Sequence, residues 1–461
     1  MAKKEAVNSA DTQTISVKNA FLHGDVATKC SAVVLGAGNM ARKQIVKGLL
    51  FLALEVVFIV FMIQRGVAFL GDFFTLGTST GEEVFNETKQ IYEYTQGDNS
   101  MLCLLYGLIT IFVVIAFVFL WCSSLKSAYM AQIKQEMGKK VPGILDDIKG
   151  LFDSNIHKTL LTLPITCIVL FTILPLVFMI SMAFTNYDRN HQPPGQLFDW
   201  VGFKNFTDLF NSSNGLGYAF VHILGWTLVW AVFATVLNFV FGMILAMVIN
   251  RKDTKGKGFW RFIFVLSIAI PQFVSLLVMR TMLQTEGPVN VLLKEIGLID
   301  TGLPFWTNTT WARITIIVVN LWIGIPYTML QTTGILQNIP GELYESARID
   351  GAGPATIFIK ITMPYMMFVM TPYLITSFIG NINNFNVIYL LTAGKPAAMS
   401  YNNGTAGKTD LLVTWLYKLT IDLKDYNYGA VIGILTFVLC AVFSLVAYRK
   451  TGSYKNEEEF Q

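Results

Sequence analysis

Long apolar runs separated by polar segments constrain the fold of this chain more than any other feature. A helix needs about 20 mainly apolar residues to cross the hydrocarbon core of a bilayer. Only 14% of the residues are charged, whereas soluble domains carry about 25%. The sequence therefore predicts an all-α integral membrane protein with eight transmembrane helices. The expected spans are Ile45–Ile63, Met101–Trp121, Leu160–Phe184, Phe220–Ile249, Phe259–Leu283, Ile314–Leu336, Met366–Leu390 and Gly429–Tyr448.

The placement of Lys and Arg predicts the orientation of these spans. With the N-terminus inside, the inner segments hold 21 Lys and Arg residues and the outer segments hold 9. Positively charged residues concentrate in cytoplasmic loops. We therefore expect both termini in the cytoplasm of a multi-pass protein of the plasma membrane. The same orientation places the polar segment 337–365 in the cytoplasm.

That polar segment contains glycine and proline at positions that favour a compact element. It reads E-S-A-R-I-D-G from Glu345 to Gly351 and ends in I-T-M-P at Pro364. Pro340 and Pro354 suit the first turn of a helix, and Gly351 suits a left-handed helix end. The pattern predicts a short helix, a tight turn and a second short helix that Pro364 closes. Such an element could fit a cleft on a partner, although an ordinary loop with incidental helices is the alternative.

Polar residues inside the sixth and seventh spans suggest a binding site. Asn320, Gly324 and Tyr327 are expected to share one helical face, and Asn381 and Asn384 another. Asparagine at membrane depth is costly unless it meets polar groups or water. Amides, an aromatic ring and glycine together suit a sugar. Hydrogen bonds between packed helices would explain the same residues equally well.

Three further polar groups lie within apolar spans. Pro271 frees a backbone carbonyl in the fifth span, and Gln272 either points into a cavity or satisfies that kink. Glu55 and Arg280 are intramembrane charges, which are functional by default. We favour a structural explanation for both: Glu55 faces neighbouring protein, and Arg280 extends toward the membrane surface.

These motifs together carry a family resemblance. The cytoplasmic segment resembles the E-A-A, three residues, G, nine residues, I-x-L-P signature of permease subunits of bacterial ABC importers, with Ser346 and Met363 as its two substitutions. The stretches 320–327, 377–385 and 198–206 extend the likeness. The chain resembles the larger, eight-span permease subunit of maltose/maltodextrin ABC importers, the MalF type.

The resemblance implies a division of the chain and a set of functional residues. A type I ABC importer permease core is expected at 155–450, after a cytoplasmic tail (1–44) and two extra helices with a linker (45–154), and before a second tail (451–461). Sugar contacts are expected from Gln272, Asn320, Ile323, Gly324, Tyr327, Ser377, Asn381 and Asn384. Coupling to the ATPase is expected from Glu345, Ser346, Ala347, Asp350, Gly351, Ile361 and Pro364. Gly380 stands where the family tends to place an aromatic residue, so the exact sugar stays open.

The resemblance also implies partners. They are a second, six-span permease subunit, a dimer of ATPase subunits that use ATP and Mg, an extracellular sugar-binding protein, an oligosaccharide substrate and membrane lipid, with no nucleic acid. This chain would bind no cofactor or metal and would hydrolyse no ATP. The outer segment 185–219 is short, whereas enteric members of the family carry a large periplasmic domain there. We therefore expect an organism without an outer membrane and a lipid-anchored binding protein.

Two other functional classes fit the residues less well. An ion-coupled secondary transporter would need buried acids and often two similar halves, but only Glu55 is a candidate acid. An integral membrane enzyme would need a cluster of His, Asp or Ser on one side. The four His and five Cys residues are scattered, which does not indicate a metal site.

Two glycine-rich stretches imitate nucleotide-binding motifs. Residues 33–38 contain a G-x-G, but a membrane span follows instead of a βαβ unit. Residues 404–409 resemble part of a phosphate-binding loop, but the orientation places them outside. We expect them to form a flexible outer loop.

Overall fold

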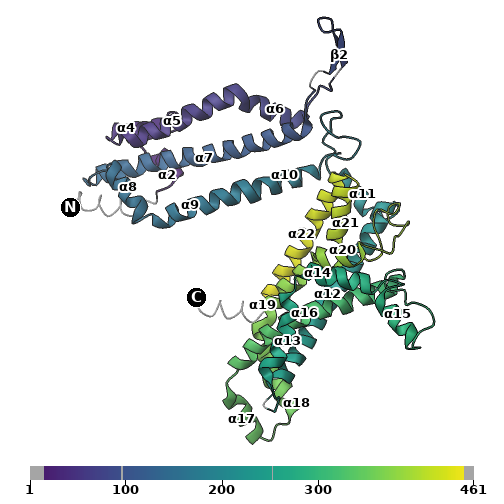
Figure 1. Ribbon diagram of the computed structural model, residues 1–461. Helices are drawn as coiled ribbons and strands as arrows, with labels where there is room; N and C mark the ends of the chain where they lie inside the picture. Colours follow the sequence, from purple (N-terminus) through teal and green to yellow (C-terminus); the bar gives the residue numbers. More distant parts are fainter. Residues whose placement is uncertain (1–14, 82, 95–96, 252, 451–461) are drawn as a thin grey trace. The chain divides into compact units, whose positions relative to one another are not determined.

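The computed structural model describes residues 15–81, 83–94, 97–251 and 253–450. The chain divides into two compact units, with the boundary between Trp200 and Val201 (Figure 1). Each unit has its own packing and is described separately.

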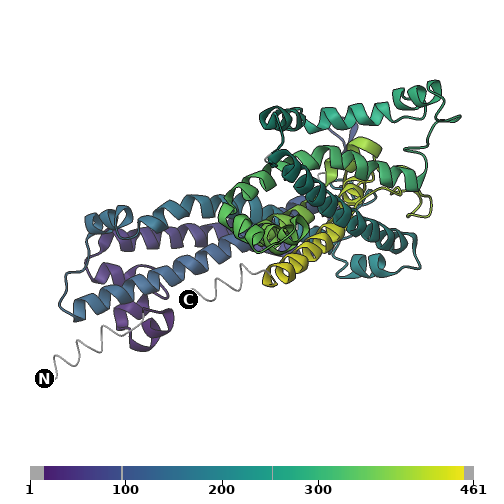
Figure 2. The same cartoon turned by 90° about the horizontal axis from the view of Figure 1, so that it is seen from below.

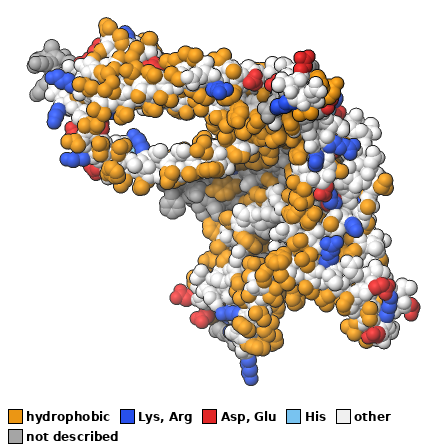
Figure 3. All heavy atoms as spheres, turned by 45° about the horizontal axis from the view of Figure 1, so that its top comes forward, with side chains coloured by type: hydrophobic (Ala, Val, Ile, Leu, Met, Phe, Trp, Pro, Cys, Tyr) orange, Lys and Arg blue, Asp and Glu red, His pale blue; other side chains and the backbone are white. Residues whose placement is uncertain are grey.

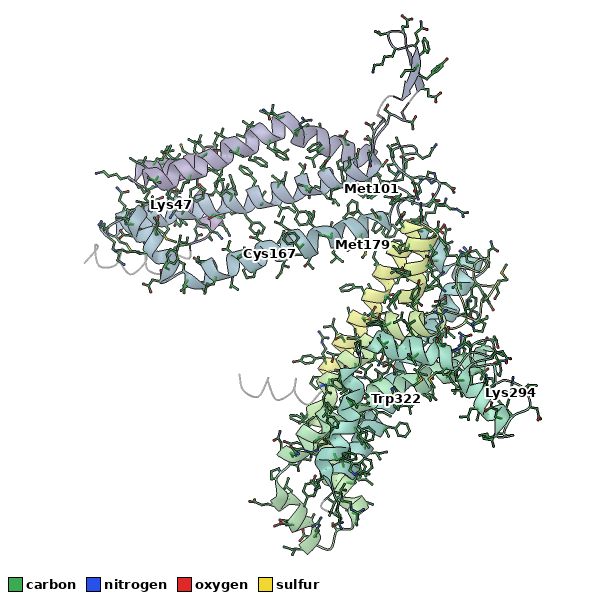
Figure 4. All side chains as sticks on the ribbon, viewed as in Figure 1. Lys47, Met101, Cys167, Met179, Lys294 and Trp322 are labelled. Atoms are coloured by element: carbon green, nitrogen blue, oxygen red, sulfur yellow. The ribbon has the colours of Figure 1, made fainter. Side chains whose placement is uncertain are left out.

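The first unit consists of three long apolar helices and several short elements. The long helices run up and down: Lys47 lies at one end of this unit, and Met101 and Met179 lie at the other (Figure 4). A two-stranded antiparallel hairpin, which the sequence did not predict, precedes the second long helix. The elements are α2 (Val17–His23), α3 (Val26–Cys30), α4 (Ala37–Ala41), α5 (Ile45–Phe61), the π-helical turn η1 (Met62–Gly66), α6 (Val67–Thr75), β1 (Glu83–Asn86), β2 (Ile91–Tyr94), α7 (Ser100–Glu136), α8 (Ile144–Phe152), α9 (Ile156–Ile168), η2 (Val169–Ile173) and α10 (Leu174–Met182).

The short helices α2, α3 and α4 pack against the long helices and are not merely a polar tail. The buried Glu55 accepts a hydrogen bond from the backbone N–H of Leu35 at 2.8 Å. The N–H of Gly36 donates to Ser124 Oγ at 2.9 Å. Gly36 has a φ of +81°, and a Cβ there would lie 2.3 Å from the carbonyl oxygen of Gly48. The prediction that Glu55 faces protein is thus confirmed, and the glycine of the G-x-G serves close packing.

The second unit contains the remaining apolar helices and the polar segment between two of them. Figure 2 shows this unit in a second orientation. Its elements are α11 (Lys204–Phe210), α12 (Gly215–Asn250), α13 (Lys257–Ala269), α14 (Gln272–Met282), α15 (Pro288–Glu295), α16 (Thr309–Asn338), α17 (Gly341–Ile349), α18 (Pro354–Ile357), η3 (Phe358–Thr362), α19 (Met363–Ile382), α20 (Phe385–Thr392), α21 (Leu412–Tyr417), η4 (Lys418–Asp422) and α22 (Tyr426–Arg449).

Helix α12 is the centre of the second unit, because α16 and α19 both pack along it. Glycine permits the close approach of α12 and α16. A Cβ on Gly242 of α12 would lie 2.5 Å from Thr328 Cβ, and a Cβ on Gly324 of α16 would lie 2.2 Å from Asn238 Nδ2. Small residues at such contacts let two helix backbones meet closely in a membrane.

The helices agree with the predicted spans. Within the described residues, seven helices are long and apolar enough to cross a membrane, and an eighth span results if α13 and α14 are counted together. These two helices meet at a bend of 87°. The break falls at Ile270 and Pro271, where proline forces the preceding residue out of the helical conformation. The chain is therefore an all-α integral membrane protein, apart from the one hairpin.

The distribution of side chains fits this conclusion. Apolar side chains cover the long helices, whereas charged side chains gather mainly near the ends of the helices (Figure 3). In the helix formed by α9, η2 and α10, no residue of the most apolar stretch is buried within the chain. Such a surface is stable against lipid tails or another apolar helix but is costly against water.

We predict that Gly242→Ala destabilises the second unit. The added Cβ would collide with Thr328 Cβ and would lie 3.1 Å from the backbone nitrogen of Met329. Overpacking of this kind costs about 1–3 kcal/mol. The measurement is the thermal unfolding midpoint of the purified chain in detergent, which should fall.

Gly225→Ala is the matched control, because Gly225 lies on the same helix and its Cβ would meet no heavy atom within 4 Å. Alanine is favoured over glycine in a helix by about 1 kcal/mol, so this variant should unfold at the same temperature or higher. Equal midpoints for the two variants would contradict the importance of the α12–α16 contact.

Candidate functional site

The polar segment 337–365 folds into the predicted helix, tight turn and second helix. Helix α17 ends with two backbone hydrogen bonds, from Gly351 N to Arg348 O at 3.1 Å and from Ala352 N to Ala347 O at 2.9 Å. Together they form a Schellman motif, which needs a left-handed residue after the helix. Gly351 supplies it with a φ of +79°. The conformation predicted for Gly351 is therefore confirmed.

The prediction that Pro364 closes the second helix is wrong. Helix α18 continues through the π-helical turn η3 into α19, which carries on into the span. Met363 N donates to Phe358 O across the wide turn. Pro364 then lies in the first turn of α19, where a missing N–H is tolerated. The second half of the motif is thus continuous with a membrane helix.

The turn presents a surface that this chain does not cover. Glu345, Ser346 and Asp350 are exposed, as is Pro364, while Ala347 and Ile361 are half-buried. Ile349 is 86% exposed, which is unusual for a large apolar side chain and is typical of an interaction surface. A hydrogen bond of 3.2 Å between Tyr344 Oη and Thr362 Oγ1 fastens α17 to η3.

The chain connects this turn directly to two membrane helices. Only Ile339 and Pro340 separate the end of α16 from α17, and α18 runs through η3 into α19. Figure 1 shows α17 and α18 beyond one end of α16 and α19. A displacement of the turn would therefore act on both helices that carry the predicted polar residues.

Gly324 of α16 faces Asn238 of α12, and Asn320 lies four residues before Gly324 on α16. Asn320 is only 5% exposed, and its Nδ2 has no hydrogen-bond partner among the described residues. The same is true of Asn238 Oδ1 on α12. An unpaired buried amide group costs about 1–3 kcal/mol. Among the described residues, α16 thus buries an unused donor and α12 buries an unused acceptor.

Asn381 on α19 also meets α12, but its polar groups are satisfied. Its side-chain Nδ2 donates to Thr235 Oγ1 at 3.0 Å, and its main-chain carbonyl oxygen accepts from Trp230 Nε1 at 3.0 Å. The expectation that Asn384 shares a helical face with Asn381 is wrong, because α19 ends at Ile382. Asn384 instead caps α20, accepting from Val387 N at 3.2 Å.

The other predicted sugar contacts lie in different surroundings. Ile323 packs against the apolar cluster around Trp230 and Ile316. Tyr327 on α16 is 48% exposed, like Trp322, which Figure 4 labels on the same helix. Gln272 is exposed at the first position of α14, and Ser377 is half-buried in α19. The structure therefore places Gly324 and Asn381 against α12, buries Asn320 on α16, and leaves Tyr327 and Gln272 exposed.

Helix α12 contributes polar side chains that were not predicted from the sequence. Thr235 and Asn238 lie three residues apart in the fourth apolar run, and they face Asn381 and Gly324, respectively. The sequence contained a signal for Asn238, because an asparagine inside the fourth span is as costly as one inside the sixth or seventh span.

The loop after α20 is anchored and is not the flexible loop expected at 404–409. The buried Asp410 accepts from Gly407 N at 2.6 Å and from Lys418 Nζ at 2.6 Å. Burial raises the pKa of Asp410, and the Lys418 ammonium opposes that rise. Thr409 Oγ1 donates to Lys395 O at 2.7 Å. The glycines and threonines that imitate a phosphate-binding loop therefore hold the loop together.

Comparison with known proteins places the chain in a family. Residues 238–450 match the family described as the binding-protein-dependent transport system inner membrane component. The chain is 33% identical over 436 residues to a maltodextrin transport system permease protein of Streptococcus pneumoniae, covering 93% of this chain and 96% of that protein. It is 34% identical over 438 residues to a galactooligosaccharides transport system permease protein of Bacillus subtilis, covering 94% and 99%.

A solved structure agrees with these relatives. A bacterial ABC transporter involved in the import of the acidic polysaccharide alginate contains a chain with a TM-score of 0.54 and 25% identity, and the match covers 65% of this chain and 96% of that one. The chain described here therefore belongs to the inner membrane permease subunits of binding-protein-dependent ABC transport systems, with the type I permease fold.

Proposed function

We propose that this chain is a translocation subunit of an ATP-driven importer for oligosaccharides of the maltose/maltodextrin type. It receives sugar from an extracellular binding protein and passes it through a cavity that opens alternately to each side. A second permease subunit completes the pathway, and a dimer of ATPase subunits, which uses ATP and Mg, supplies the energy. This chain itself holds no catalytic residue or cofactor.

The observation that carries this proposal is the continuity between the exposed turn and the polar helices. An ATPase surface that moves α17 and α18 would displace α16 and α19 together, because the chain links them without a flexible segment. Those two helices carry Asn320, Tyr327 and Asn381. Glu345, Ser346, Ala347, Asp350 and Gly351 would meet the ATPase, while Ile361 and Pro364 would join the turn to α19.

The unused groups at the α12–α16 contact support a role in sugar binding. A hydroxyl both donates and accepts, so a sugar could satisfy Asn320 Nδ2 and Asn238 Oδ1 together when the helices separate. Gln272, Gly324, Ile323, Tyr327, Ser377 and Asn384 would complete the pathway at other stages of transport. The excess of Lys and Arg on the side of the turn supports cytoplasmic termini, and the short segment 185–219 supports an organism without an outer membrane.

Relatives named for maltodextrin and for galactooligosaccharides are almost equally similar to this chain, so a galactooligosaccharide importer is the second candidate. An ion-coupled secondary transporter is less favoured, because Glu55 is engaged by the backbone of Leu35. Co-purification of the chain from its native membrane tests the assembly directly: recovery without an ATPase subunit would count against the proposal.

We predict that Gly351→Val abolishes sugar uptake while the chain still inserts into the membrane. A β-branched residue is strongly disfavoured at a φ of +79°, so the turn would lose its shape. The measurements are uptake of labelled maltodextrin by cells and the abundance of the chain in their membranes.

Gly353→Val provides the control. Gly353 lies in the same turn with a φ of −72° and a ψ of 164°, which valine adopts readily. A Cβ at Gly351 or at Gly353 would meet no heavy atom within 4 Å. The two variants therefore differ mainly in backbone strain, and equal uptake by both would exclude the turn geometry as the coupling element.

We predict that Asn320→Leu raises the sugar concentration needed for half-maximal uptake by about ten-fold, as expected for the loss of roughly 1.4 kcal/mol of binding. Leucine removes an unpaired donor and preserves the apolar contact, so the thermal stability of the chain should not fall. Thr332→Val is the matched control. Thr332 also lies on α16, and its buried Oγ1 has no hydrogen-bond partner among the described residues.

Thr332 lies outside the predicted sugar contacts, so its variant should keep the sugar dependence of the unaltered chain. If Asn320→Leu leaves sugar dependence unchanged but lowers the unfolding temperature, Asn320 is a packing residue and the sugar site lies elsewhere.

A further inference from the structure

A cationic cavity lies at the end of α12 and α16 that is distant from the turn α17–α18. It has a volume of about 530 Å³ and is lined by residues of α12, of α16 and of the anchored loop after α20. Arg313 and Lys408 supply its positive charge, and Trp226, Tyr401 and His222 supply aromatic rings.

The two cations are held in fixed positions by aromatic rings. Arg313 Cζ lies 4.4 Å from the centroid of the Trp226 ring, and Lys408 Nζ lies 3.9 Å from the centroid of the Tyr401 ring. Arg313 Nε and Nη2 donate to the carbonyl oxygen of Lys408 at 3.1 and 2.9 Å. These contacts bring the two positive side chains to one wall of the cavity and leave further guanidinium donors for a ligand.

The cavity lacks a counter-charge from this chain. Among the residues that the structure describes, no ion pair joins Arg313 or Lys408 to a carboxylate. Two half-buried cations that line one cavity are stable only if an anion or water compensates their charge. The chemistry of the cavity therefore favours an anionic ligand with several acceptor oxygens.

An apolar groove continues from this cavity along the same two helices. It has a volume of about 460 Å³ and shares Trp226, Val229, Thr309 and Arg313 with the cationic cavity. Its other walls are apolar side chains of α12 and α16, among them Phe233, Leu237, Ile317, Val318 and Leu321. A site with a cationic head and a long apolar continuation matches an amphiphile better than a sugar or a peptide.

We propose that this combined site binds an anionic phospholipid, with the phosphate at Arg313 and Lys408 and an acyl chain in the groove between α12 and α16. Basic pockets between membrane helices recognise anionic headgroups in this way, and Trp226 lines both the cationic cavity and the apolar groove. The bound lipid would offset part of the positive charge of the two cations and fill the surface beside the contact on which the second unit depends.

The test compares two lipids that differ only in the headgroup. The full chain, with any subunits that co-purify, is titrated with dioleoyl-phosphatidylglycerol or dioleoyl-phosphatidylcholine, and bound lipid is counted by native mass spectrometry. Both lipids carry a phosphate, but Arg313 and Lys408 would repel the choline ammonium of the second lipid, so we expect the anionic lipid to bind about ten-fold more tightly. The double variant Arg313→Gln/Lys408→Gln should lose this preference.

Two control variants keep the result interpretable. Lys395→Gln/Lys424→Gln removes two charges from exposed side chains of the same region and should keep the preference. Lys408→Gln alone leaves the contact of Arg313 with the Lys408 carbonyl intact, so it should weaken the preference without disturbing the loop. Unfolding midpoints of all variants show whether a loss of binding reflects a loss of folding.

Several results would overturn the proposal. Equal binding of the two lipids would exclude headgroup recognition. Binding of inorganic phosphate as tightly as the anionic lipid would make the groove irrelevant. A preference seen for the isolated chain but absent from the co-purified complex would mean that another subunit covers the groove.

Discussion

The close contact between α12 and α16 is the interaction on which the second unit depends. In a bilayer, apolar burial gives little drive for one helix to associate with another, so association depends on close packing and on interhelical hydrogen bonds. Gly242 and Gly324 permit that packing from opposite sides of the contact. Helix α19 then adds to α12 through Asn381. The cationic cavity, the apolar groove and the unused amide groups all lie along these same helices.

The polar residues of these helices fall into two classes with different consequences. Asn381 is satisfied by Thr235, and hydrogen bonding of this kind explains its presence without any ligand. Asn320 and Asn238 each bury an amide atom that has no hydrogen-bond partner among the described residues. This costs free energy that packing alone does not offset. The sequence alone does not distinguish Asn381 from Asn320 and Asn238. Only the contacts seen in the structure distinguish residues that pack helices together from candidate ligand groups.

Much of the architecture could be predicted from the sequence, because its signals are local. The length of the apolar runs predicted the spans, and Gly351 with Pro340 and Pro354 predicted the cytoplasmic turn. Signals that depend on distant partners were missed. The sequence predicted that Pro364 ends a helix, because no residue pattern indicates the π-helical turn that precedes it. That turn lets the helix continue through Pro364. Asn384 was placed on a helical face because the helix end at Ile382 carries no glycine or proline to mark it. The anchoring of residues 404–409 depends on Asp410 and Lys418, whose pairing requires the fold.

The open surroundings of the turn between α17 and α18 have a consequence for how its sequence is constrained. A Cβ added at Gly341, Gly351 or Gly353 would meet no heavy atom within 4 Å, and most side chains of α17 are exposed. The free energy of unfolding of the chain therefore depends little on the exposed side chains there, apart from the backbone demand at Gly351 and the hydrogen bond between Tyr344 and Thr362. A surface that meets a partner can change its chemistry here with little cost to folding, so specificity for one partner over another is largely separable from the stability of the membrane domain.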